Sequence, residues 1–254
     1  MSNGVFVTGT DTGVGKTVVS AALIRRLRQM HCSVGVMKPV ETGVRLESRD
    51  GTDAGRLMAA AESTDSLDLV SPYRFYSPLA PLAAARVENR GIEVSEILSR
   101  FSELASNYSC VLVEGAGGLL VPVGEDWAIR ELIVRLGLSV LVVGRASLGG
   151  VNHALLTLES LLHAGVTVVA LVLNETTAAA TAVEQSQVAS TVALLRAKGG
   201  VPVFGPLPYQ AGLEDDWADR IEIFARSHAI MDVADLVWRA TAGKSGPPMS
   251  NRKR

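Results

Sequence analysis

The chain has 254 residues, of which 48% are hydrophobic and 20% charged, and this composition excludes a disordered or fibrous protein. Its 24 Lys and Arg against 26 Asp and Glu leave a net charge of −2, without the basic excess of a dedicated nucleic-acid binder. We therefore expect a globular protein with no nucleic-acid partner.

The first predicted elements are a strand at residues 5–7 and a helix after it. The helix is predicted by apolar residues that recur every three or four positions, the spacing of one helix face: Val19, Leu23, Leu27 and Met30. Residues 33–40 predict a second strand, and Pro39 favours an extended conformation at Lys38. A further helix is expected at residues 53–61, followed by a loop up to residue 81.

Later strands and helices alternate along the chain. Strands are expected at residues 110–113, 139–143, 168–173 and 201–204. Helical stretches lie between most of them, at residues 129–136, 152–164 and 183–198. Buried strands that are joined through helices lie parallel in one sheet, so the expected fold is α/β, a mostly parallel sheet with helices on both faces.

Neither an internal repeat nor a long linker divides this pattern, so one domain is expected over residues 1–241. Residues 242–254 contain Gly, Ser, Pro and a basic end, and they predict a mobile tail, with a nucleic-acid-binding arm as the alternative.

No segment has the features of a membrane span or a signal peptide. The longest strongly apolar stretch free of charge, between Glu159 and Glu175, holds 15 residues, short of the ~18–20 that cross a bilayer. The first apolar run, at Val5, has no basic region before it. Cys32 and Cys110 are too few for a disulfide framework and suit small buried residues in a reducing compartment. The expected location is cytoplasmic, with no membrane partner.

A glycine-rich segment joins the first strand to the first helix. It has the form Gly9-x₅-Gly15-Lys16-Thr17, one residue longer than the common Gly-x₄-Gly-Lys-Thr pattern of a phosphate-binding P-loop. Glycines let consecutive N–H groups face a phosphate, and the helix N-terminus adds positive potential. Lys16 is expected to bridge the outer phosphates, and the Thr17 hydroxyl to coordinate Mg²⁺. A turn that binds nothing is disfavoured, because Lys-Thr at a helix start has no structural requirement.

A second glycine-rich segment, residues 114–118, follows the strand at 110–113. A dinucleotide fingerprint is a weak interpretation, since no helix follows and Pro122 soon interrupts the segment. We instead expect Glu114 at the C-terminal end of its strand, as a carboxylate for Mg²⁺ beside the P-loop. Asp53 is a second candidate oxygen ligand, with a helix N-cap as the alternative.

Four segments resemble the dethiobiotin synthetase family, the ATP-dependent carboxylases and cyclases of biotin synthesis. They are residues 7–17, 38–43, 113–118 and 148–154, in the family's order, and the longer P-loop is the family's own form. The resemblance implies a P-loop NTPase-like fold, a homodimer and a cyclo-ligase (EC 6.3.3.3) that uses ATP and Mg²⁺. It would carboxylate 7,8-diaminononanoate with CO2 to a carbamate, phosphorylate it to a carbamic-phosphoric anhydride, and close the ring to give dethiobiotin, ADP and phosphate.

The resemblance also implies the site residues. Catalytic roles would belong to Lys38, Lys16 and Thr12, and metal binding to Thr17, Asp53 and Glu114. The residues implied to bind ATP are Gly13, Val14, Gly15, Lys16, Thr17, Val18, Asp53, Glu114, Gly115, Ala116, Gly117, Asn174, Glu175, Pro208, Tyr209 and Gln210. Those implied to bind the diamine are Thr42, Gly149, Gly150, Val151 and Asn152.

General chemistry agrees with these roles. Phosphoryl transfer from ATP to a carbamate joins two anions, so cations such as Lys16, Lys38 and Mg²⁺ must neutralise the developing charge. Residues 149–152 open a predicted helix, whose N–H groups suit the terminal carboxylate of the substrate. The structural alternatives are a surface lysine at Lys38 and glycines needed for close packing at the helix start.

Three other functions compete with the ligase. A deviant P-loop ATPase of the partitioning or metal-carrier type would carry a second lysine where this chain has Thr10 or Asp11. A cobalamin-type amidating ligase would need a glutaminase domain, for which 254 residues leave no room. A nucleotide-binding regulatory subunit is the non-enzymatic alternative. A zinc site has little support, with two distant cysteines and four scattered histidines.

Overall fold

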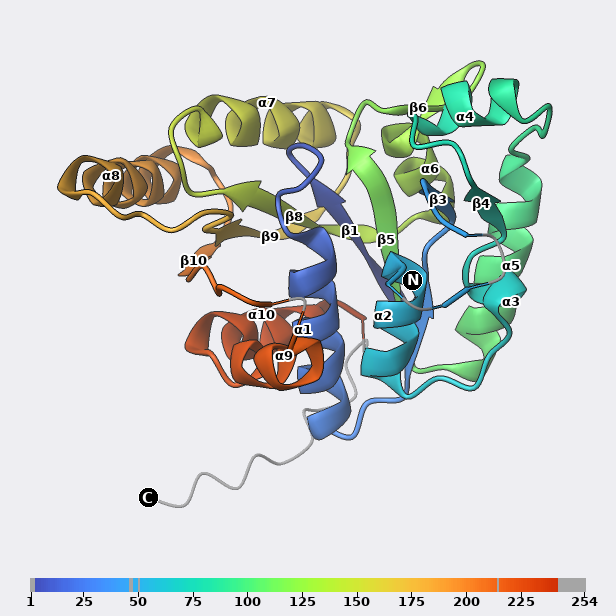
Figure 1. Ribbon diagram of the computed structural model, residues 1–254, viewed down its shortest axis with the longest axis horizontal. Coiled ribbons are helices and arrows are strands. Elements are labelled where there is room, and N and C mark those ends of the chain that lie inside the picture. The colour runs from blue at the N-terminus through green and yellow to red at the C-terminus, as the bar shows by residue number, and fades with distance from the viewer. Residues whose placement is uncertain (1–2, 46–47, 50, 214, 242–254) are drawn as a thin grey trace.

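The computed structural model describes residues 3–45, 48–49, 51–213 and 215–241, and the tail expected at 242–254 lies outside them. The centre is a six-stranded sheet in the order β10-β9-β8-β1-β5-β2, and every neighbouring pair is parallel (Figure 1). Its strands are β1 (Gly4–Gly9), β2 (Val34–Met37), β5 (Cys110–Gly118), β8 (Ser139–Arg145), β9 (Val168–Asn174) and β10 (Val203–Leu207). The predicted parallel α/β sheet is confirmed.

Successive strand residues point to opposite sides of the sheet, so apolar strands have two apolar faces, and helices cover both. Phe6 packs in one apolar core and its neighbours Val5 and Val7 in the other. The core that contains Phe6 lies under α5 (Val94–Asn107), α6 (Ile129–Leu136), α7 (Gly150–His163) and α8 (Ala182–Lys198). The opposite core lies under α1 (Lys16–Gln29), α2 (Asp53–Ala61), α9 (Trp217–Ala225) and α10 (His228–Thr241). Among the described residues, no helix has the length and apolar character to cross a membrane.

The prediction of one strand over residues 33–40 is wrong. β2 ends at Met37, and the chain enters a separate strand, β3 (Val40–Thr42). The break lies at Lys38, whose N–H donates to the carbonyl of Val70 at 2.8 Å, and at Pro39, which has no N–H to donate. The strand β3 pairs instead with β4 (Tyr73–Phe75).

The remaining elements fill segments that the sequence analysis left open or assigned to loops. Between α2 and residue 81 lie α3 (Leu67–Val70) and β4, where a loop was expected. The others are α4 (Pro81–Val87), β6 (Pro122–Gly124) and β7 (Trp127–Ala128). Several predicted strand ends also move. The strand β5 continues to Gly118 beside Gly9 of β1, β8 continues to Arg145, and the last strand covers Val203–Leu207 instead of residues 201–204.

Candidate active site

The loop between β1 and α1 has the backbone geometry of an anion-binding turn. Gly13 and Gly15 have φ angles of +73° and +91°, which glycine adopts without a steric penalty. A Cβ atom on Gly15 would lie 2.1 Å from Asn174 Nδ2, and that amide donates to the carbonyl of Val14 at 3.2 Å. The end of β9 therefore supports the loop. Because the first N–H groups of a helix lack intrahelical partners, the start of α1 at Lys16 is suited to bind an anion.

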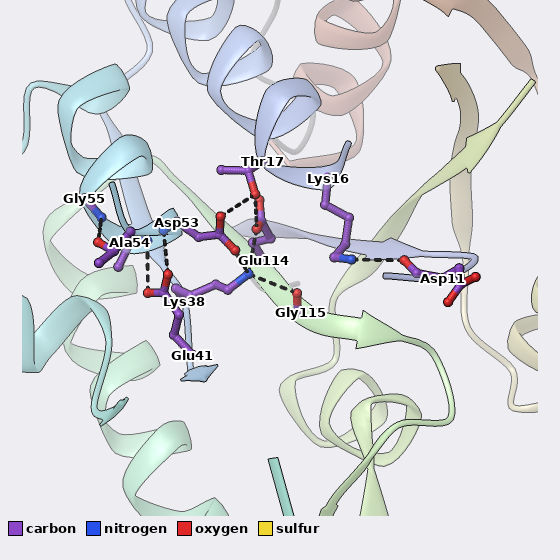
Figure 2. A network of polar contacts seen from close by, with 11 residues as sticks. Asp11, Lys16, Thr17, Lys38, Glu41, Asp53, Ala54, Gly55, Glu114 and Gly115 are labelled. Atoms are coloured by element: carbon purple, nitrogen blue, oxygen red, sulfur yellow. Dashed lines mark hydrogen bonds and ion pairs between the residues drawn. The ribbon is translucent and has the colours of Figure 1, made fainter. Parts of the chain in front are cut away.

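Lys38, Asp53 and Glu114 meet beside Thr17, as Figure 2 shows. Lys38 Nζ lies 2.7 Å from both Asp53 Oδ2 and Glu114 Oε1, and it also donates to the carbonyl of Gly115 at 3.4 Å. Thr17 Oγ1 lies 2.9 Å from Asp53 Oδ1 and 2.9 Å from Glu114 Oε1. The segment after β2 and the elements α1, α2 and β5 thus each contribute one side chain to a single cluster.

The charges of this cluster stabilise one another. Burial would lower the pKa of Lys38, but the carboxylates of Glu114 and Asp53 raise it above its ordinary value. Burial would raise the pKa of Asp53, but the Lys38 ammonium holds it below its ordinary value. Burial, aided by the nearby Lys38 charge, lowers the pKa of Lys16 to about 8. At neutral pH, Lys38 is therefore a cation and Asp53 an anion.

The oxygen atoms around Thr17 fit a magnesium ion. The set comprises one hydroxyl and the carboxylates of Asp53 and Glu114, and Mg²⁺ in phosphate-binding sites uses one or two protein carboxylates together with water and phosphate oxygens. Glu114 Oε2 is buried and has no hydrogen-bond partner among the described residues, a cost that a cation would remove. The described residues contain no group of three or more His, Cys, Asp or Glu side chains that could hold a metal.

The structure decides between the two interpretations of Asp53. Thr52 is the N-cap of α2, because its hydroxyl accepts the N–H of Gly55 at 3.0 Å. Asp53 is the first residue of the helix, and its carboxylate contacts Thr17 and Lys38 instead. The helix N-cap alternative for Asp53 is therefore wrong.

Two cavities adjoin the P-loop. The first, of about 490 Å³, brings together eleven of the residues that the sequence analysis selected: Thr12, Gly13, Gly15, Lys16, Thr17, Val18, Lys38, Thr42, Asp53, Ala116 and Gly117. The second, of about 350 Å³, is lined by the other selected residues Asn174, Glu175, Pro208, Tyr209 and Gln210. Both cavities are lined by Gly13, Gly15 and Val18, so they lie next to each other along the P-loop.

The helix start at residues 149–152 does not line the cavity that Thr42 lines. Gly149 caps α7 with a φ of +86°, and α7 begins at Gly150, close to the predicted position. Neither cavity beside the P-loop is lined by these residues. The two parts predicted to bind the substrate therefore do not line the same one of these two cavities.

The sequence analysis missed several residues at the site. Glu41, 5% exposed, accepts the N–H groups of Asp53 and Ala54, and burial raises its pKa. Its position between Lys38 and Thr42 was the available signal. Arg56 lies over the ring of Trp217 at 4.3 Å, and both line the first cavity. Trp217 lies beyond the region of family resemblance, so nothing in the sequence singled it out.

Asp11 in the P-loop pairs with Arg145 at the end of β8, and its carbonyl accepts Lys16 Nζ at 3.2 Å. This is one of the two positions at which a deviant P-loop ATPase would carry its second lysine. The chain therefore presents a carboxylate there, already paired with a cation from its own sheet.

Comparisons with known proteins place this site in context. Residues 3–216 match a family model described as an AAA domain. The chain is 48% identical over 172 residues to the ATP-dependent dethiobiotin synthetase BioD of Anaeromyxobacter sp. (strain Fw109-5), a match that covers 68% of this chain and 76% of the relative. It is 37% identical over 227 residues to the BioD of Thermodesulfovibrio yellowstonii, covering 85% and 92% of the two chains.

Among solved structures, the chain is similar to a chain of the MinC:MinD cell division protein complex of Aquifex aeolicus. The TM-score is 0.54 at 16% identity, and the match covers 92% of this chain and 95% of that one. At this identity the likeness concerns the fold alone. The P-loop NTPase-like fold expected from the sequence is confirmed.

Proposed function

The chain belongs to the ATP-dependent dethiobiotin synthetase family and is a ligase, and we propose that it converts 7,8-diaminononanoate, CO2 and ATP to dethiobiotin, ADP and phosphate. One observation carries the proposal: Lys38, Asp53 and Glu114 meet beside Thr17, at a cavity that Thr42 also lines. We further propose a cytoplasmic location, because ATP is the co-substrate. We also propose a homodimer, because residues 149–152 do not line the cavity that Thr42 lines.

ATP is proposed to extend across both cavities. Lys16 and the N–H groups at the start of α1 would hold the triphosphate, with Thr12 close by in the loop. The adenine would occupy the second cavity, among Asn174, Glu175, Pro208, Tyr209 and Gln210. Because both cavities are lined by Gly13, Gly15 and Val18, one ligand can reach from the first to the second.

The chemistry needs positive charge at the transferred phosphoryl group. An uncharged amine of the substrate attacks CO2, and the resulting carbamate anion would lie near Lys38, with the Thr42 hydroxyl on the diamine. A carbamate oxygen then attacks the γ-phosphorus while the bond to ADP breaks, and Lys16 and Lys38 stabilise the charge on the transferred group. Mg²⁺, held by Thr17, Asp53 and Glu114, would supply further positive charge to the phosphates. The second amine attacks the carbamoyl carbon, and phosphate leaves as the ureido ring closes.

The alternative of a deviant P-loop ATPase of the partitioning or metal-carrier type is not favoured. The relatives are named synthetases, and the P-loop carries Asp11, paired with Arg145, at a position where that class would have a lysine.

Oxygen transfer tests the proposal directly. Bicarbonate labelled with ¹⁸O is supplied with ATP and the diamine, in a reaction short enough that the label does not exchange with water. The attacking carbamate oxygen leaves on phosphate, so each ring closed must deliver one labelled oxygen to inorganic phosphate. A simple ATPase takes that oxygen from solvent. Unlabelled phosphate, with exchange controlled, would exclude the ligase mechanism.

A further inference from the structure

Glu41 is a buried carboxylate directly beside the proposed catalytic residues. It is the middle residue of the short strand β3, three positions after Lys38 and one before Thr42, and it is only 5% exposed. A buried carboxylate costs free energy unless hydrogen bonds satisfy its oxygens. Its partners therefore indicate what it does.

Both oxygens of Glu41 accept backbone N–H groups from the start of α2, as Figure 2 shows. Oε1 lies 2.5 Å from the N–H nitrogen of Asp53, and Oε2 lies 3.2 Å from that of Ala54. The first N–H groups of a helix have no intrahelical partners, and a negative charge there also interacts favourably with the helix dipole. Thr52 satisfies the next N–H, that of Gly55. The first turn of α2 is thus attached to β3 through one side chain.

The residue that Glu41 holds by its backbone is the one whose side chain enters the cluster. Asp53 directs Oδ1 to Thr17 at 2.9 Å and Oδ2 to Lys38 at 2.7 Å. Lys38 and Thr42 lie on the same segment as Glu41, on either side of it. The Glu41 carboxylate therefore joins the segment that carries Lys38 to the helix that carries Asp53.

We propose that Glu41 is a positioning residue that fixes the Asp53 carboxylate for Mg²⁺ and for Lys38. The proposal rests on the proposed function, in which Asp53 serves metal binding. Residues that orient a metal ligand without touching the metal change metal affinity or activity by about 10–100-fold when they are replaced.

The test replaces Glu41 by Gln, which preserves its size but leaves one oxygen to accept two N–H groups. We expect faster amide hydrogen exchange at Asp53 and Ala54. We also expect about a tenfold higher Mg²⁺ half-saturation, titrated with a nonhydrolysable ATP analogue bound. The value of kcat should fall while the KM for ATP changes little. Unchanged Mg²⁺ binding in folded Glu41→Gln would overturn the proposal.

Thr52→Ala is the matched control. It removes a bond to the same helical turn, at Gly55, and leaves both Glu41 contacts in place. It should lower the melting temperature and keep the wild-type Mg²⁺ half-saturation. If Thr52→Ala weakens Mg²⁺ binding as much as Glu41→Gln, Glu41 merely stabilises α2 and the proposal is wrong.

Further outcomes also decide the role of Glu41. If Glu41→Gln does not fold, Glu41→Asp is used instead; it retains the charge on a shorter side chain and should also weaken Mg²⁺ binding. Normal Mg²⁺ binding by Glu41→Asp contradicts the proposal. A wild-type protein that binds no Mg²⁺ contradicts it as well. Amide exchange and Mg²⁺ binding are both measured without turnover. If the wild-type enzyme makes no dethiobiotin, the proposed function fails, and amide exchange and Mg²⁺ binding still decide the role of Glu41.

Discussion

Lys16 and Lys38 lie close together but in different electrostatic surroundings. Lys38 has two carboxylate oxygens at 2.7 Å, which hold its charge in place, whereas Lys16 donates to the carbonyl of Asp11 at 3.2 Å. Burial and the Lys38 charge lower the pKa of Lys16 to about 8, so an anion bound beside it would stabilise its charged form. The two lysines should therefore respond differently to substitution.

Replacing Lys16 by Ala should weaken ATP binding and leave the fold intact. The lost charge-assisted contact is worth roughly 1.5–3 kcal/mol, and the backbone amides of the loop remain. Calorimetry with ATP measures the affinity, and thermal unfolding provides the control for folding. An affinity equal to that of the wild type would remove the P-loop assignment.

Replacing Lys38 by Gln should lower kcat by about 10²-fold or more, comparable to the loss of one strong electrostatic donor. ATP affinity should change little, because Lys16 and the loop amides still hold the triphosphate. The variant also leaves Glu114, which is fully buried, without its ammonium partner, so a lower melting temperature is expected. Steady-state kinetics well below that temperature separates the two effects, and a normal kcat there would exclude a catalytic role.

The connection between β8 and α7 depends on a glycine. A Cβ atom on Gly150 would lie 2.2 Å from the carbonyl oxygen of Arg145, so a side chain at this position must displace the start of α7. Gly165, after the other end of α7, has a φ of +70° and open space where a Cβ atom would lie. A substitution there strains the chain without moving the helix start.

Gly150→Leu should raise the KM for the diamine about tenfold, equivalent to ~1.4 kcal/mol, and the KM for ATP by less. The reason is that the N–H groups at residues 149–152 are proposed to hold the substrate carboxylate, while ATP contacts other elements. Gly165→Ala is the control for general strain in α7 and should leave both constants near their wild-type values. Equal effects of Gly150→Leu on the two substrates would argue against this carboxylate site.

For the molecule as a whole, we propose that the diamine site is built from two chains. Thr42 lines the first cavity and residues 149–152 do not. Beside and along α7, Leu148, Leu156 and Leu162 are exposed apolar side chains, and we propose that a second chain covers some of them. A symmetric dimer would supply the helix start from the second chain.

Mixing two impaired variants tests this arrangement at a diamine concentration well below the wild-type KM, where Lys38→Gln should retain about a hundredth and Gly150→Leu about a tenth of wild-type activity. In a dimer of one Lys38→Gln chain and one Gly150→Leu chain, one site combines Lys38 from the second chain with Gly150 from the first, and the other site has both defects. Random exchange of subunits should therefore restore about a quarter of wild-type activity. A mixture whose activity does not rise after verified exchange, or a fully active monomer, would place the whole site within one chain.

Local sequence patterns were enough to predict the P-loop, the parallel sheet and most residues of the proposed site. These features have local signals: apolar periodicity marks the strands and helices, glycines mark backbone conformations that other residues avoid, and Lys16-Thr17 begins a helix. The position of Glu114 at a strand end and of Asp53 after the second strand already indicated carboxylates for Mg²⁺, and the family resemblance added Lys38 as a catalytic cation. The structure places these three side chains in contact with Thr17 or with one another.

The end of β2, the contacts of Glu41 and the grouping of predicted residues around a cavity follow from the folded chain and had no local signal. The strand breaks at Lys38 because its N–H bonds to Val70, a residue distant in sequence, and Glu41 is satisfied by helix N–H groups twelve and thirteen positions later. A hydrogen-bond partner far along the chain leaves no periodic or compositional signal near the residue that it pairs with. For the same reason, the sequence could not show that the start of α7 does not line the cavity that Thr42 lines. Folding, rather than any local pattern, decides which distant segments come together.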